Sequence, residues 1–227
     1  MKPSIWYEIT ICGRLTVFLS CLGIPAYIVL MRLFWGRYDE LSPDMVLQTF
    51  VILLPLVSGL AAAHLMSIEN EVGFSELRLT YPEPRFKLPV LRTIMAMVLI
   101  LLSMILGVIM FVWLWGLPNF NLLPCLLPAI FPAIFLSGLS MLINGFSHSY
   151  WVAAASVMGW WFFELQTRGQ ITGVMFLFHT IWPNAGISAE VNQAFLAVVG
   201  LGLLILNIFL YTSQVKRGTI AHGLRTG

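Results

Sequence analysis

The residues that could carry chemistry in this chain gather mainly in one polar segment, residues 67–89. Ser67 or Asn70 could cap a short helix there, and the glutamates that follow suit its first turn because the helix dipole favours negative charge. This helix must end by Tyr81, since Pro82 disfavours helical geometry in the residue before it. We expect a short, charged, rigid helix that contacts another protein; the alternative is a solvated loop helix on lipid headgroups.

Enzyme signatures are missing from the rest of the sequence. No Gly-Lys pair is present, so no Walker-type loop can hold ATP, and no HExxH motif is present for a zinc protease. The histidines lie in separate segments without metal-ligand spacing, and the cysteines form no CxxC pair; these residues are His64, His148, His179, His222, Cys12, Cys21 and Cys125. An enzyme is therefore the least supported class of function.

The composition places the chain in a membrane. Of its 227 residues, 59% are hydrophobic and only 10% are charged, whereas a soluble domain carries roughly 25% charged residues. This excludes a soluble enzyme and a disordered tail. A net charge of +2 without a basic run also gives no footprint for nucleic acid.

Six apolar stretches are candidates to cross the membrane, for which a helix needs about 20 residues. Five are long enough, and a sixth, residues 151–165, reaches spanning length only if its helix starts near Gly145 and takes in Ser147 to Ser149. The five are residues 15–35, 45–66, 90–115, 122–143 and 194–212.

The distribution of basic residues sets the expected orientation, because lysine and arginine concentrate on the cytoplasmic side. With six crossings and both termini cytoplasmic, the inner segments hold nine of the 12 basic residues. With five crossings, the three basic residues after position 212 would lie outside. We therefore expect an all-α protein with six transmembrane helices and both termini in the cytoplasm.

Three further features refine this plan. Residues 2–12 suit a short helix in the inner interface, or alternatively an extension of the first span. Residues 173–183 are apolar but too short to cross, which suits a re-entrant or interfacial helix on the outer side. The fourth span carries Pro124, Pro128 and Pro132 on one helical face. Each removes a backbone hydrogen bond, so we expect a kinked or partly unwound helix that acts as a hinge or lines a cavity; ordinary packing is the alternative.

Almost no ionisable group lies in the middle of a predicted span. Glu164, for example, sits near the outer end of the fifth. Carriers that use an ion gradient usually keep a carboxylate at mid-membrane to bind the ion. The energy for any transport is therefore expected to come from outside this chain.

At the polar segment the sequence resembles the permease subunits of ABC transporters of the type-2 exporter class. These permeases carry a Glu-x-Gly-x-x-Glu-Leu-x-Leu-x-x-Pro-like stretch after the second span, followed by a basic residue. Here residues 71–82 read EVGFSELRLTYP, with Arg85 after them. The plan of an interfacial N-terminal helix, six spans and a re-entrant outer segment also agrees. The resemblance implies a single permease domain over residues 1–227, without a nucleotide-binding domain.

The resemblance also implies partners and a mechanism. A coupling helix in the 67–89 segment would dock on a separate ATP-binding subunit, which holds ATP and Mg²⁺, while this chain binds no cofactor. A second permease copy or paralogue and membrane lipid would complete the assembly in a bacterial plasma membrane. Phe74 and Leu77 would anchor the contact, and charged residues would fix its orientation; the charged residues are Glu71, Glu76, Arg78 and Arg85.

Other functions stay open on the sequence alone. A non-transporting accessory, immunity or sensor protein would need the polar segment only as a docking site. For a permease, the apolar spans with scattered Ser58, Asn144 and Asn207 suit an amphipathic, lipid-like or peptide cargo; the alternative is that these are ordinary packing residues.

Overall fold

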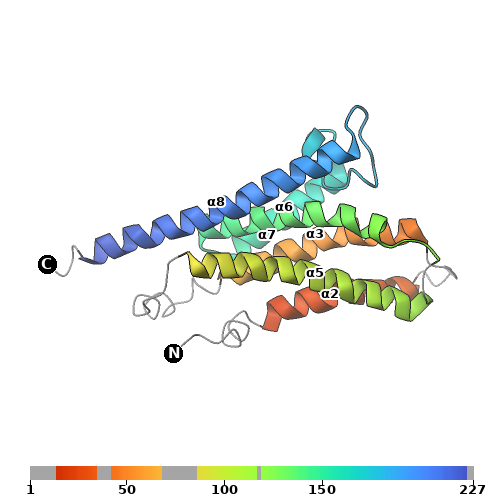
Figure 1. Ribbon diagram of the computed structural model, residues 1–227, viewed down its shortest axis with the longest axis horizontal. Helices are drawn as coiled ribbons and strands as arrows, with labels where there is room; N and C mark the ends of the chain where they lie inside the picture. The colour runs from red at the N-terminus through yellow and green to blue at the C-terminus, as the bar shows by residue number, and fades with distance from the viewer. Residues whose placement is uncertain (1–13, 35–41, 68–85, 117–118, 224–227) are drawn as a thin grey trace.

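A computed structural model of the chain describes residues 14–34, 42–67, 86–116 and 119–223. These residues form six α-helices and one short 3₁₀ turn, η2 (Figure 1). The elements are α2 (Arg14–Phe34), α3 (Pro43–Ser67), α5 (Lys87–Trp115), α6 (Leu123–Ser147), α7 (Tyr150–Thr167), η2 (Gly173–Met175) and α8 (Ala189–Gly223).

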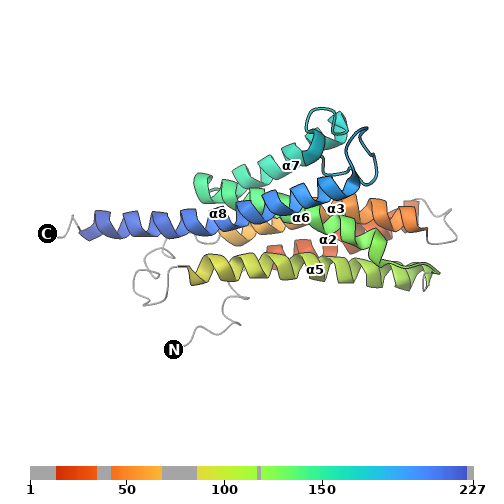
Figure 2. The ribbon, with the colours of Figure 1, turned by 45° about the horizontal axis from the view of Figure 1, so that its top comes forward.

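The helices form one elongated bundle in which consecutive helices run in opposite directions (Figures 1 and 2). We call the end where α3 and α6 stop and α5 and α7 begin the inner end, and the opposite end the outer end. The helix α2 begins and α8 stops toward the inner end. The centre is the α3–α6 pair, with α2 and α5 packed on one side and α7 and α8 on the other.

Four of the helices are long and apolar enough to cross a membrane: α3, α5, α6 and the 189–213 part of α8. This confirms the prediction of a helical membrane protein. The helix α7 is not among these four, and the side chains of α2 are described only in part. The described apolar part of α2 runs from Leu22 to Phe34. The 18 residues of α7 rise only about 27 Å, at 1.5 Å per residue.

The helix bounds differ from the predicted ones at the junction of α6 and α7. The expected extension of the fifth span back to Gly145 is wrong, because α6 continues through Ser147. His148 then adopts a left-handed conformation with φ of 51°, and its N–H donates to the Asn144 carbonyl at 2.8 Å. This cap ends α6, and α7 begins two residues later at Tyr150.

The predicted proline effect on α6 also needs correction. Pro124 lies in the first turn, where its missing N–H has no intrahelical acceptor to lose. Pro128 and Pro132 are buried inside the helix, which stays α-helical from Leu123 to Ser147. The helix is therefore not partly unwound, and the alternative of a kink stays a prediction. The hinge and cavity-lining roles stay predictions.

Small residues allow the central helices to approach closely. A Cβ built on Gly138 of α6 would lie 2.7 Å from the Gly200 carbonyl oxygen of α8, and one on Gly200 would lie 2.8 Å from the Phe135 nitrogen. Glycine at both positions brings the two backbones into contact, as is common in membrane bundles. Larger side chains, such as Phe50, Phe135 and Met141, are fully buried in the core of the bundle.

Candidate functional site

The six predicted contact residues lie outside the described residues; they are Glu71, Phe74, Glu76, Leu77, Arg78 and Arg85. The predicted N-terminal interfacial helix, residues 2–12, lies outside them too. What the structure does describe is the pair of helix ends that bracket the polar segment. These are the last turn of α3 and the first turns of α5, both at the inner end (Figure 1).

A buried arginine joins these two helix ends. Arg92, in the second turn of α5, has no solvent-exposed surface. Its Nη1 donates a hydrogen bond to the carbonyl oxygen of Leu65 in the last turn of α3. The last carbonyls of a helix lack intrahelical partners and carry partial negative charge, so a cation at this position is favourable.

A buried amide joins the same end of α3 to α6. The side chain of Asn144 donates from Nδ2 to the carbonyl oxygen of Ala63 at 2.8 Å, and the residue is 1% exposed. Between the two acceptors, the His64 carbonyl accepts from the Ser67 hydroxyl at 2.9 Å. Three successive carbonyls at the end of α3 therefore receive side-chain donors, two of them from neighbouring helices.

An aromatic contact extends this arrangement to α7. The His64 ring of α3 and the Tyr150 ring of α7 meet edge to face, with centroids 5.6 Å apart and planes at 75°. Rings in this arrangement attract one another beyond the area they bury. The inner end of α3 thus contacts α5, α6 and α7 through three different side chains.

Two of the sequence-selected polar residues within the spans also have defined places. Ser58 donates to the Pro55 carbonyl at 3.0 Å and lies 3.4 Å from the Ala133 carbonyl of α6. Asn207 of α8 is 1% exposed, and its Nδ2 has no hydrogen-bond partner in the described structure. They lie on different helices, α3 and α8.

Pro55 lies near the middle of α3, and close to it the indole of Trp161 donates a hydrogen bond to an α3 carbonyl. Proline at this position removes one N–H from the helix ladder, and neighbouring helices commonly supply donors to carbonyls near such a proline. The Nε1–H of Trp161 on α7 donates to the Ile52 carbonyl at 2.7 Å. This bond fixes α7 against α3 although α7 is short.

At the outer end, residues 168–188 form a compact cap on α7 and α8. The predicted helix over residues 173–183 is wrong, because this stretch holds only the 3₁₀ turn η2 followed by hydrogen-bonded turns. Phe176, Leu177 and Phe178 are buried beneath it. The amide of Asn192 donates to the Val174 carbonyl at 2.7 Å and to the Phe176 carbonyl at 2.9 Å.

Two buried titratable side chains lie at this outer end, one on α7 beneath the cap and one in the cap. Glu164 is fully buried; one of its carboxyl oxygens accepts from the Thr172 hydroxyl at 3.0 Å, and the other has no partner among the described residues. His179 accepts at Nε2 from the Asn184 N–H at 3.3 Å, while its Nδ1 has no partner in the part of the chain that the structure describes. Within the described ranges, no three His, Cys, Asp or Glu residues are placed to hold a metal ion.

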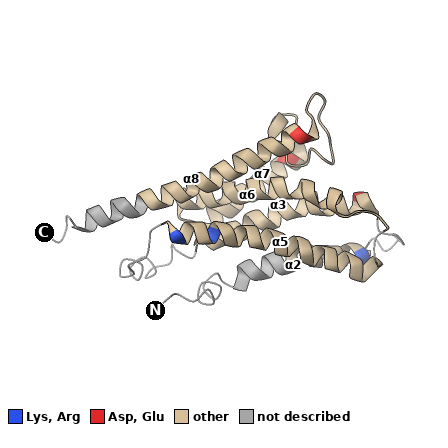
Figure 3. Cartoon of the chain, in the orientation of Figure 1, with Lys and Arg blue, Asp and Glu red and all other residues tan. Residues whose placement is uncertain are grey.

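Charged side chains avoid the middle of the bundle. In the described part, lysine, arginine, aspartate and glutamate lie near the two ends (Figure 3). Lys87 and Arg92 stand at the inner end, whereas Asp44 and Glu190 open helices at the outer end. The uncharged middle matches the pattern seen in the sequence.

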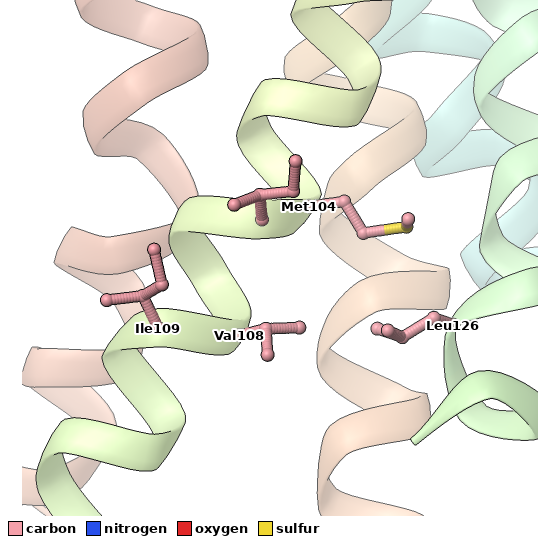
Figure 4. Close-up of a pocket in the computed structure, with 5 residues that line it drawn as sticks. Met104, Val108, Ile109 and Leu126 are labelled. Carbon is pink, nitrogen blue, oxygen red and sulfur yellow. The ribbon is translucent and has the colours of Figure 1, made fainter. Parts of the chain in front are cut away.

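One apolar pocket opens between α5 and α6 in the outer half of the bundle (Figure 4). All of its lining side chains are aliphatic or thioether: Met104, Ile105, Val108, Ile109 and Leu126. Such a wall offers no hydrogen bond to a polar ligand. It suits hydrocarbon.

Comparison with known proteins gives no match to a family model, to a curated protein or to a solved structure.

Proposed function

We propose that this chain is the membrane-spanning permease subunit of an ATP-driven exporter, powered by a separate ATP-binding subunit that docks on residues 67–89. The observation that carries the proposal is the position of this polar, exporter-like segment. It connects two helix ends that a buried Arg92 ties together at one end of an apolar bundle. A segment held in this way is suited to receive force from a partner.

The membrane arrangement belongs to the same proposal. All six helices cross, with α2 and α7 completing the four longer spans, and both termini lie in the cytoplasm. In support, the alternating helix directions bring the start of α2 and the end of α8 toward the same end (Figure 1). Lys87 and Arg92 at the inner end follow the positive-inside bias.

The cargo proposed is amphipathic, lipid-like or a hydrophobic peptide. The described spans offer mid-membrane surfaces without charge, and the pocket between α5 and α6 is lined only by apolar side chains. ATP and Mg²⁺ would be bound by the partner subunit, and a second permease, identical or paralogous, would complete the transport path.

The test is copurification. The chain is tagged after Gly227, extracted gently from its native membrane and examined for bound proteins. We expect a stoichiometric ATP-binding subunit, lost when Glu76→Arg is combined with Leu77→Asp. The matched control, Gln166→Arg with Ile171→Asp, places the same charges at exposed outer-end positions and should keep the subunit.

A clean preparation without an ATPase, from cells that express one, would refute the permease proposal. The favoured function would then be that of a non-transporting accessory or sensor protein, with the polar segment as its docking site. Loss of the ATPase in the outer-end control as well would mean that the charge changes act through folding rather than through contact.

A further inference from the structure

The end of α3 is held by donors from two other helices. Helix termini leave the last carbonyls without intrahelical partners, and an apolar environment makes each unpaired carbonyl costly. Arg92 of α5 supplies the donor to Leu65, which is one of these last carbonyls. Asn144 of α6 donates at 2.8 Å to Ala63, the carbonyl just before the last four. These two bonds lie within one turn of α3 and come from two different helices.

Separating α5 from α3 at this end is energetically costly because of Arg92. Its side chain is fully buried, and a guanidinium in an apolar interior is stable only while dipoles or charges face it. Sliding or rotating α5 along α3 would take the cation away from the carbonyl oxygen of Leu65. The two helix ends are therefore held in one relative position.

Asn144 extends the connection to α6 and from there to α8. It is 1% exposed and stands in the last turns of α6. One and two turns earlier on the same helix, Ser140 and Ser137 are also buried, and Gly138 meets the α8 backbone at Gly200. A displacement that reaches Asn144 is thus passed to a helix pair whose backbones touch.

The polar segment enters and leaves the bundle beside these bonds. It leaves α3 after Ser67, two residues beyond Leu65, and α5 begins at Lys87, five residues before Arg92. Both attachments lie within about one and a half helical turns of the Arg92–Leu65 bond, at 3.6 residues per turn. Any force on the segment is applied directly to the clamped helix ends.

We propose that Arg92 and Asn144 are positioning residues that form an inner-end clamp, which makes the ends of α3, α5 and α6 move as one unit. That the clamp passes the motion of the docked 67–89 segment to α6 rests on the proposed function. The clamp itself is a property of the isolated chain. The two parts can therefore be tested separately.

The first experiment measures the clamp without a partner. Spin labels are placed at Phe86→Cys, beside the start of α5, and Phe146→Cys, in the last turn of α6; both positions are exposed. The native cysteines are replaced by alanine, and the chain is held in lipid nanodiscs. We expect one narrow label-to-label distance distribution in the unmodified background.

Asn144→Leu is the decisive variant because leucine is close to asparagine in size and branching, yet it carries no group that can donate to the Ala63 carbonyl. We expect the distance distribution to broaden and shift. Ser137→Ala is the matched control, since that buried hydroxyl on the same helix has no hydrogen-bond partner among the described residues; it should leave the distribution unchanged. Arg92→Lys, which keeps the charge but loses the planar donor fork, should give an intermediate result.

The second experiment adds the copurified ATP-binding subunit. In the unmodified chain the Phe86–Phe146 distance should stay the same with and without ATP, because the two helix ends move together. In Asn144→Leu the subunit should still bind and hydrolyse ATP, but ATP should now change that distance, because α5 moves without α6.

The outcomes separate the two claims. A distribution as narrow in Asn144→Leu and Arg92→Lys as in Ser137→Ala would overturn the clamp, whatever the function of the chain. A clamp seen in nanodiscs, with no ATP-dependent change in Asn144→Leu, would overturn the transmission role alone. Absence of any ATPase partner from the unmodified chain would overturn the proposed function and with it the transmission role, while the nanodisc result on the clamp would stand.

Discussion

The two ends of the bundle are held together in opposite ways. At the inner end, the side-chain hydrogen bonds between helices join residues 27 and 81 positions apart in the chain. At the outer end, the side-chain hydrogen bonds of the 168–188 cap join residues only 5 to 18 positions apart. The inner end therefore depends on several helices at once, whereas the outer cap closes largely on itself and its two flanking helices.

This contrast assigns different mechanical properties to the two ends. Local contacts open and close in small cooperative units, while contacts between distant helices resist separation until the bundle itself rearranges. A change in the outer cap should stay in the cap. A change at the inner end should alter how whole helices sit against one another.

The largest loss of stability is expected from Asn192→Leu, in the first turn of α8, whose side chain holds the outer cap. Two backbone carbonyls, of Val174 and Phe176, lose their side-chain donor, and at about 1–3 kcal/mol for each buried group left unsatisfied the loss of stability should be roughly 2–6 kcal/mol. Denaturant unfolding in detergent measures it. Limited proteolysis should show cleavage in residues 168–188 and no change in the Phe86–Phe146 label distance.

The neighbouring Gln193→Leu is the control for Asn192→Leu, because Gln193 is half-buried on the same helical turn and should change stability little. An altered inner-end distance in Asn192→Leu would contradict the separation of the two ends.

The second-largest loss of stability is expected from one of two glycine substitutions in the cap, at positions that both have positive φ. In Gly169→Ala the new Cβ would lie 2.4 Å from Cγ of Phe176, whereas in Gly186→Ala nothing lies within 4 Å; the φ values are 72° and 89°. Both variants incur backbone strain of about 1 kcal/mol, but only Gly169→Ala adds overpacking of roughly 1–3 kcal/mol. Thermal unfolding of the two variants side by side isolates the packing contribution, and equal midpoints would show that the cap is loosely packed.

The smallest effect is expected from Arg168→Gln. The Arg168 guanidinium lies over the Trp182 ring, 5.7 Å from its centroid, and an exposed cation–π contact is worth about 0.5–1 kcal/mol. The fluorescence of the cap tryptophans and the unfolding midpoint should shift slightly. A loss as large as that of Asn192→Leu would mean that Arg168 does more than cover the ring.

Hydropathy was sufficient to locate the helices but not their junctions. The predicted stretches 45–66 and 90–115 fall inside α3 (Pro43–Ser67) and α5 (Lys87–Trp115), because a long apolar run leaves little choice of structure. The corner between α6 and α7 was missed. It depends on the left-handed conformation of His148, whose N–H donates to the Asn144 carbonyl. A short Ser-His-Ser sequence is compatible with either a helix or a turn, so the sequence does not predict this corner.

The role of Arg92 was also missed, although the sequence contains a signal for it. The buried residues of α5 include Pro89, Ala96, Ser103 and Gly107, and Arg92 falls on the same face. A stripe of small residues marks the side of a membrane helix that meets other helices, so an arginine on that stripe must be buried. Its acceptor, a backbone carbonyl 27 residues earlier, has no side-chain signature and only the fold reveals it.

The buried Arg92 also bears on how the chain is assembled during synthesis. A positive charge inside an apolar run opposes entry into the bilayer on its own. Its acceptor at Leu65 is translated first, so α3 is already present when α5 leaves the ribosome. Asn144, on the later α6, then adds the second bond. Because α3 precedes α5 and α6 in the chain, the acceptors of Arg92 and Asn144 are already in the membrane when these side chains enter it. The helix α3 thus acts as the template on which α5 and α6 pack.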